Sequence, residues 1–127
     1  MSGVTQTYWY HFNQNNSGGG FDIDPDRGIG PRVWIEAVNA GHANYIARDL
    51  GIYFDGVDDG IDCQCCGDRW HWASDYGSNR GHEPLIPREY SFYWHPYTYL
   101  HPLSGGVIAI SKDQQDLPAP FKFREGY

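Results

Sequence analysis

Alternating apolar and polar positions in the first third of the chain predict three β-strands. Residues 7–12 (TYWYHF) are rich in the aromatic side chains that strands favour. Residues 21–24 (FDID) alternate apolar and acidic positions, so we expect a second strand that pairs with the first as a hairpin. Residues 33–37 (VWIEA) follow a proline and predict a third strand.

The apolar pattern then changes to the period of an α-helix. Apolar residues recur at positions i, i+3, i+4 and i+7, which places them on one face of a helix: Ala43, Ile46, Ala47 and Leu50. Asn39 is a favourable N-cap residue, and Gly51 stands where a glycine commonly ends a helix. The spacing therefore predicts one helix over about residues 40–50.

The second half of the chain has shorter apolar runs. Residues 52–54 (IYF) and 107–110 (VIAI) predict short strands, and the aromatic stretch 89–99 predicts another. Residues 73–87 are polar with weak periodicity, so we expect a loop there.

These elements predict a single α+β domain over residues 1–127. We expect a mostly antiparallel sheet, one main helix (about 40–50) and a zinc-knuckle-like turn at residues 63–66. A chain of 127 residues can bury roughly two thirds of its unfolded surface, so a real core is expected. The aromatic fraction of 17% indicates a core rich in Trp and Tyr.

The charge of the chain excludes one large class of function. The 16 Asp and Glu outnumber the 9 Lys and Arg, which gives a formal net charge of −7. General binding to nucleic acid needs a basic face, so we expect none here. No apolar run approaches the length of about 18 residues that a membrane helix needs, so we also expect no membrane partner. Residues 1–6 are polar, and we expect no signal peptide.

The three cysteines of the chain lie within four positions and predict a metal site. Cys63, Cys66 and Gly67 form a Cys-x-x-Cys-Gly turn, in which two thiolates can face one ion. A structural Zn²⁺ site needs four ligands, and we expect Cys65 and His71 to be the further ones. Adjacent cysteines usually point apart, which weakens the case for Cys65. Two alternatives remain open: reduced thiols without metal, and a redox-active Cys-x-x-Cys.

Three other segments suggest chemistry less specifically. The acidic run Asp55, Asp58, Asp59 and Asp62 is expected to be a solvated loop. Residues 13–20 (NQNNSGGG) could cradle a phosphate with backbone N–H groups, but no lysine follows them as in a P-loop. The tryptophans and tyrosines between residues 70 and 99 are expected to lie mostly in the core and on the sheet.

Four motifs run in one order: residues 10–19 (YHFNQNNSGG), 28–37 (GIGPRVWIEA), 51–56 (GIYFDG) and 62–70 (DCQCCGDRW). This series resembles a small protein family of unknown function that is widespread in tailed-bacteriophage genomes. The likeness covers about residues 8–70. It implies a viral origin and expression inside a bacterial host, and it carries over no catalytic residue or ligand.

The sequence leads to one expected function and two alternatives. We expect a non-catalytic phage accessory protein, stabilised by zinc, that binds a host protein or a small host molecule in the host bacterial cytoplasm. One alternative is a virion or assembly component that forms a homo-oligomer. The other is a zinc-dependent or nucleotide-handling enzyme, which would need an open metal site. If the zinc is structural, its removal should unfold the protein.

Overall fold

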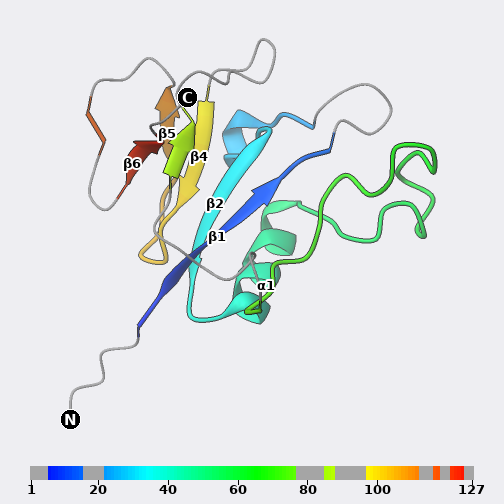
Figure 1. The fold of residues 1–127 in the computed structure, drawn as a ribbon, viewed down its shortest axis with the longest axis horizontal. Coiled ribbons are helices and arrows are strands. Elements are labelled where there is room, and N and C mark those ends of the chain that lie inside the picture. The colour runs from blue at the N-terminus through cyan, green and yellow to red at the C-terminus, as the bar shows by residue number, and fades with distance from the viewer. Residues whose placement is uncertain are drawn as a thin grey trace.

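The computed structural model describes residues 6–15, 22–76, 85–87, 97–111, 116–117 and 121–124. Four strands form the main sheet in the order β1-β2-β4-β5: β1 (Tyr8–Asn13), β2 (Arg32–Ala37), β4 (Tyr97–His101) and β5 (Ile108–Ser111). A second sheet pairs β3 (Leu85–Pro87) with β6 (Lys122–Arg124). Helix α1 (Ala40–Leu50) and the short 3-10 helix η2 (Pro25–Arg27) complete the elements (Figure 1). The α+β class and the single main helix are confirmed.

The main sheet is mostly antiparallel, as predicted, with one parallel pair at its centre. β1 pairs antiparallel with β2 from Tyr8 opposite Ala37 to Asn13 opposite Arg32, and β4 and β5 are also antiparallel. β2 and β4 are parallel, with Val33 opposite Tyr99. A parallel pair needs a long crossover connection, and α1 and the cysteine loop lie within it.

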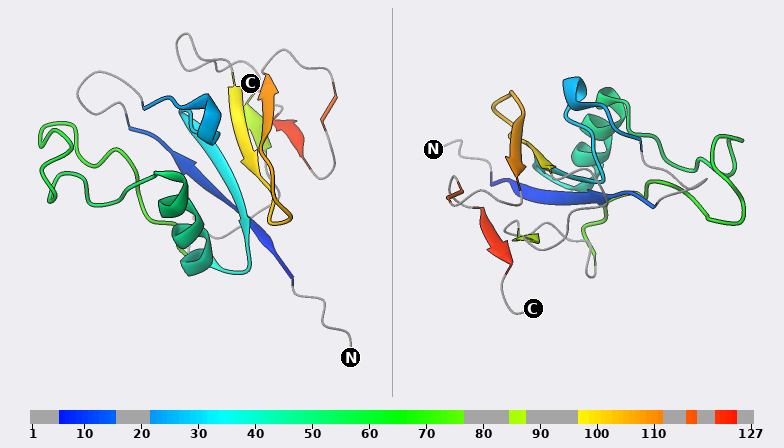
Figure 2. Two further views of the ribbon diagram at one scale, coloured as in Figure 1. Left: turned by 180° about the vertical axis from the view of Figure 1, so that it is seen from behind. Right: turned by 90° about the horizontal axis from the view of Figure 1, so that it is seen from above.

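Alternation along the strands gives the sheet two apolar faces. Tyr10 and Phe12 of β1 point to one face, where they join α1 in the larger core. Trp9 and Trp34 point to the other face, where they pack with Phe121 in a smaller core. Figure 2 shows the same arrangement, with α1 on one side of the sheet and the β3–β6 pair on the other.

Helix α1 begins and ends at the predicted residues. The Asn39 side chain accepts a hydrogen bond from the His42 N–H at 2.8 Å, which caps the first turn. Gly51 has φ +111°, a left-handed conformation that favours glycine. Ala43 and Ala47 are fully buried against the sheet. Small residues at these positions let the helix backbone approach the strands closely.

Two predicted strands are wrong. Residues 22–24 form no strand, and Asp24 makes only an isolated β-bridge to Ile29. β1 pairs with β2 and not with these residues. Residues 52–54 lie outside both sheets, although Ile52 and Phe54 are buried in the larger core. Residues 89–96 of the predicted aromatic strand lie outside the described residues, and its last residues belong to β4. In the part of the chain that is described, no helix has the length and apolar character needed to cross a bilayer.

Candidate metal centre

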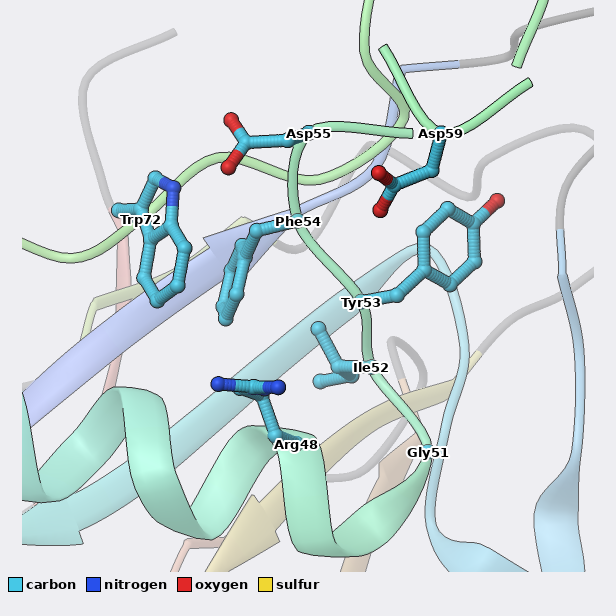
Figure 3. Close-up of a pocket in the computed structure, with 8 residues that line it drawn as sticks. All are labelled: Arg48, Gly51, Ile52, Tyr53, Phe54, Asp55, Asp59 and Trp72. Atoms are coloured by element: carbon cyan, nitrogen blue, oxygen red, sulfur yellow. The ribbon is translucent and has the colours of Figure 1, made fainter. Parts of the chain in front are cut away.

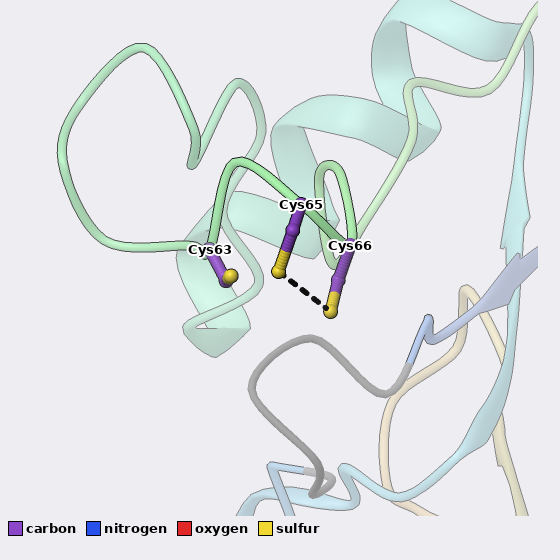
Figure 4. A group of neighbouring side chains, drawn as sticks. All are labelled: Cys63, Cys65 and Cys66. Carbon is purple, nitrogen blue, oxygen red and sulfur yellow. Dashed lines mark hydrogen bonds between the residues drawn. The ribbon is translucent and has the colours of Figure 1, made fainter.

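The three cysteine thiols come together on the long loop that follows α1. Figure 1 shows residues 51–76 (green) extending beyond the sheet before they return to it. The Sγ atoms of Cys63, Cys65 and Cys66 all lie within 4.8 Å of one another, and those of Cys65 and Cys66 are 3.7 Å apart (Figure 4). Two thiolates on one tetrahedral Zn²⁺ are about 3.8 Å apart, given Zn–S bonds of about 2.3 Å. These three thiols can therefore hold a metal ion.

The adjacent cysteines do not point apart, contrary to the sequence expectation. The N–H groups of Cys66 and Gly67 both donate to the Cys63 carbonyl, at 3.2 Å and 3.0 Å. These two hydrogen bonds close a tight turn, which ends at Gly67 with φ +86°. The turn brings the Cys65 and Cys66 side chains to the same side as Cys63. A side chain at position 67 would be strained in this left-handed conformation.

The turn is attached to the end of β1 by asparagine. The Asn15 side-chain amide donates to the Cys66 carbonyl at 2.5 Å, and the Asn15 backbone N–H donates to the Arg69 carbonyl at 2.8 Å. The neighbouring Gln14 is buried, and its Oε1 accepts from the Arg69 guanidinium at 3.1 Å. The polar residues after β1 thus fix the position of the cysteine turn.

A buried carboxylate fixes the base of the loop. The Asp62 side chain is only 1% exposed. It accepts hydrogen bonds from the Arg69 N–H and the Tyr53 hydroxyl, both at 2.8 Å, and its Oδ1 lies 3.8 Å from Arg69 Nε. The prediction that the acidic run is solvated is therefore wrong for Asp62. Asp68 has a similar role, since its Oδ1 accepts from the Val57 N–H at 2.9 Å.

The pKa values of Cys63 and Cys65 are shifted in opposite directions. The pKa of Cys63 is lowered, first because the Cys65 thiol donates to it and then because the backbone N–H groups of Cys65 and Cys66 point toward it. The pKa of Cys65 is raised to about 11, because this thiol donates to both neighbours and their negative charge opposes its ionisation. Cys63 therefore ionises at a lower pH than Cys65. A bound cation would have to displace the proton of Cys65.

The predicted histidine ligand does not join the thiols. His71 is exposed and lies outside the group of ligand atoms formed by the cysteines. His101 is buried elsewhere, where its Nε2 donates to the Gly28 carbonyl at 2.8 Å. His11 stacks on Trp34 with ring centroids 4.5 Å apart. Among the described residues, the group with metal-binding geometry therefore consists of three thiols.

Sequence reasoning missed the residues that support the site. Gln14 and Asn15 belong to the segment considered for phosphate binding, yet here they hold the loop. The rest of that segment, residues 16–20, lies outside the described residues. The Asp75 carboxylate accepts from the Ala40 N–H at 3.0 Å and from the Tyr10 hydroxyl at 2.7 Å, which fixes the return of the loop to α1. Gln14 and Asn15 lie within the first of the four sequence motifs, whereas Asp75 lies outside all of them.

The fold and the site together define a small α+β domain with a three-thiol candidate metal centre on a pinned loop. The chain belongs to the family described as a domain of unknown function, DUF7296, which matches residues 7–118. No curated protein and no solved structure matches the chain.

Proposed function

We propose that this protein is a non-catalytic binding module in which Cys63, Cys65 and Cys66 hold a structural Zn²⁺ ion. The observation that carries the proposal is the convergence of three thiols within 4.8 Å on a loop that is attached to the sheet. Three thiolates favour soft or borderline ions, and Zn²⁺ is the common choice for a structural site. A closed structural site needs a fourth protein ligand, and none of the described histidines or carboxylates joins the three thiols.

The surroundings of the thiols support a structural role over a catalytic one. Within the described residues, no histidine or carboxylate joins the group of thiols, so none stands beside them as a general base. The nearest carboxylates in sequence, Asp62 and Asp68, are engaged by N–H groups of the loop itself. A metal here would order a surface loop that presents groups to a partner.

The setting of the proposal follows from the sequence. The likeness to the phage family supports a viral accessory protein that acts in the host bacterial cytoplasm, where thiols stay reduced. The partner would be a host protein or a small host molecule. A formal net charge of −7 favours a basic or cationic partner over nucleic acid.

Native mass spectrometry tests the metal, because one spectrum reports the ion, the subunit number and any retained ligand. Protein purified from bacterial cytosol without chelator should carry one zinc per chain. Cys63→Ser and Cys66→Ser should lose the metal, whereas His71→Asn should keep it, since His71 lies outside the thiol group. A wild-type chain without metal would refute the zinc site. A metal-free, large homo-oligomer would instead favour a virion or assembly component.

A further inference from the structure

A second candidate site lies beside the loop, between the end of α1 and the segment that follows it. A cavity of about 480 Å³ opens there (Figure 3). Its size falls within the range of small-molecule pockets, which is about 300–1,000 Å³. Its walls come from the last turn of α1, from residues 51–55, and from Asp59 and Trp72. None of these lining residues is one of the three cysteines.

One wall of the pocket is aromatic. Phe54 is buried and contacts Phe12 of the core, with ring centroids 6.0 Å apart. Trp72 stacks on Phe54 at 4.1 Å with an interplanar angle of 23° and remains 45% exposed. An indole that is held flat by a core residue and still open to solvent is suited to receive a planar or cationic group.

The charged groups of the pocket lack partners, unlike those of the neighbouring loop. Within the described part of the chain, no ion pair or hydrogen bond engages the side chains of Arg48, Asp55 or Asp59. Asp62, in contrast, is fully bonded. Asp55 also has φ +58°, an unusual backbone conformation outside glycine that is more frequent at functional sites.

These charges are arranged with opposite signs at opposite ends. Figure 3 shows Arg48 rising from α1 on one side of Phe54, with Asp55 and Asp59 across the apolar wall. The pocket thus carries two negative charges and one positive charge. The whole chain, at −7, adds a field that attracts cations. A nucleotide, with two or more negative charges, matches this pattern poorly.

We propose that the pocket binds a basic amino acid with a free carboxylate, and that arginine fits it best. Arginine carries two positive charges and one carboxylate, which are opposite in sign to the two carboxylates and one guanidinium of the pocket. Its planar guanidinium can lie over Trp72 while it donates to Asp55 or Asp59, and its carboxylate can pair with Arg48. This inference names the ligand of the binding module proposed above and so rests on that function, but not on the metal.

The proposal is tested by titrating the full chain with L-arginine while the Trp72 indole resonance is followed by NMR. Citrulline is the matched control, because it has the shape of arginine without the guanidinium charge. We expect arginine to bind and citrulline to bind at least tenfold more weakly. Equal binding of the two, or tighter binding of adenosine monophosphate, would overturn the proposal.

Substitutions in the pocket separate the roles of its groups. Asp55→Asn and Asp59→Asn should each weaken arginine binding roughly threefold to tenfold, since exposed carboxylates are screened by water. Asp58→Asn removes the same charge from an exposed residue outside the pocket and should change little. If Asp58→Asn weakens binding as much as the other two, the attraction is general and the pocket is refuted.

Two further measurements complete the test. N-acetyl-arginine keeps the carboxylate and the guanidinium: retained binding indicates the carboxyl end of a peptide as the source, and reduced binding indicates the free amino acid. Metal content is read from the same samples by native mass spectrometry. Protein that carries zinc but ignores arginine would overturn the pocket alone, whereas protein that binds arginine without metal would overturn the zinc site alone.

Discussion

His11 should make the stability of this protein strongly dependent on pH. Its ring stacks on Trp34 at an interplanar angle of 13°, and its Nε2 is buried without a hydrogen-bond partner. Burial first, and then the positive charge of Arg32, lower the pKa of His11 from 6.5 to about 3. The unfolded chain therefore binds a proton at mildly acidic pH that the folded chain excludes.

The sign and size of the effect follow from this difference. Because the folded pKa is the lower one, the stability that neutral His11 provides is complete above pH 6.5. It is lost as the pH falls from 6.5 toward 3. Each pH unit in this window is worth about 1.4 kcal/mol, so the free energy of unfolding should drop by about 2 kcal/mol between pH 7 and pH 5. His101, whose pKa is lowered by burial, adds a loss in the same direction.

His11→Phe isolates the contribution of this residue, because phenylalanine can keep the stack on Trp34 and does not titrate. Urea unfolding at pH 7 and pH 5, at one ionic strength and with chelator present, gives the free energy of unfolding of each protein. We expect the wild type to lose about 2 kcal/mol more than the variant over this interval. His71→Gln, which removes an exposed histidine, should behave as the wild type does. Equal losses in the wild type and His11→Phe would refute the reasoning.

Further predictions concern the metal loop and the helix. Metal removal should speed amide hydrogen exchange in residues 55–69 while the β1–β2 pair stays protected, since the thiols lie outside both apolar cores. Loss of protection in both places would instead show that the metal stabilises the whole fold, as the sequence predicts. Asn15→Ala should lower the free energy of unfolding by about 1 kcal/mol and weaken metal binding, with Asn13→Ala as the exposed control; equal effects would contradict the role of the amide. Zn²⁺ binding should release protons near pH 7, because the pKa of Cys65 is about 11. Calorimetry in buffers of different ionisation enthalpy measures the number of protons released. A binding heat that is the same in every buffer would contradict proton release. Asn39→Ala should cost about 1 kcal/mol through loss of the helix cap, as seen in urea unfolding, and an unchanged midpoint would contradict the cap.

The elements that could be predicted from the sequence are those that local chemistry determines. The cap at Asn39, the apolar face of α1 and the left-handed Gly51 are all specified within 13 consecutive residues, and all are confirmed. The false strand at 22–24 shows where this approach fails. Its alternation resembles that of a strand, but β1 pairs instead with β2, at six consecutive positions. A local pattern of apolar and polar residues does not show which of several segments will pair with a given strand.

The candidate site follows the same division. The spacing of Cys63 and Cys66 was enough to predict a turn with thiols on it. The contacts that hold this turn join residues far apart in sequence: Asn15 reaches Cys66 across 51 positions. Asp62 looked like one member of a solvated acidic run, because nothing in its neighbourhood indicates that Arg69 and Tyr53 close over it. The pocket could not be foreseen, since it unites the end of a helix with a tryptophan from the far side of the loop.

The parallel pair at the centre of the sheet has a consequence for how quickly the protein folds. β2 pairs with β4 only when the chain between Val33 and Tyr99 closes into a loop, and closing so long a segment is entropically costly. The antiparallel β1–β2 pair needs a much shorter connection and should form first. The cysteine turn lies inside the long crossover, but an ion held by Cys63, Cys65 and Cys66 would close a loop of only four residues and would leave the entropic cost of joining β2 to β4 almost unchanged. Strand closure should therefore limit the refolding rate to the same extent with zinc and without it.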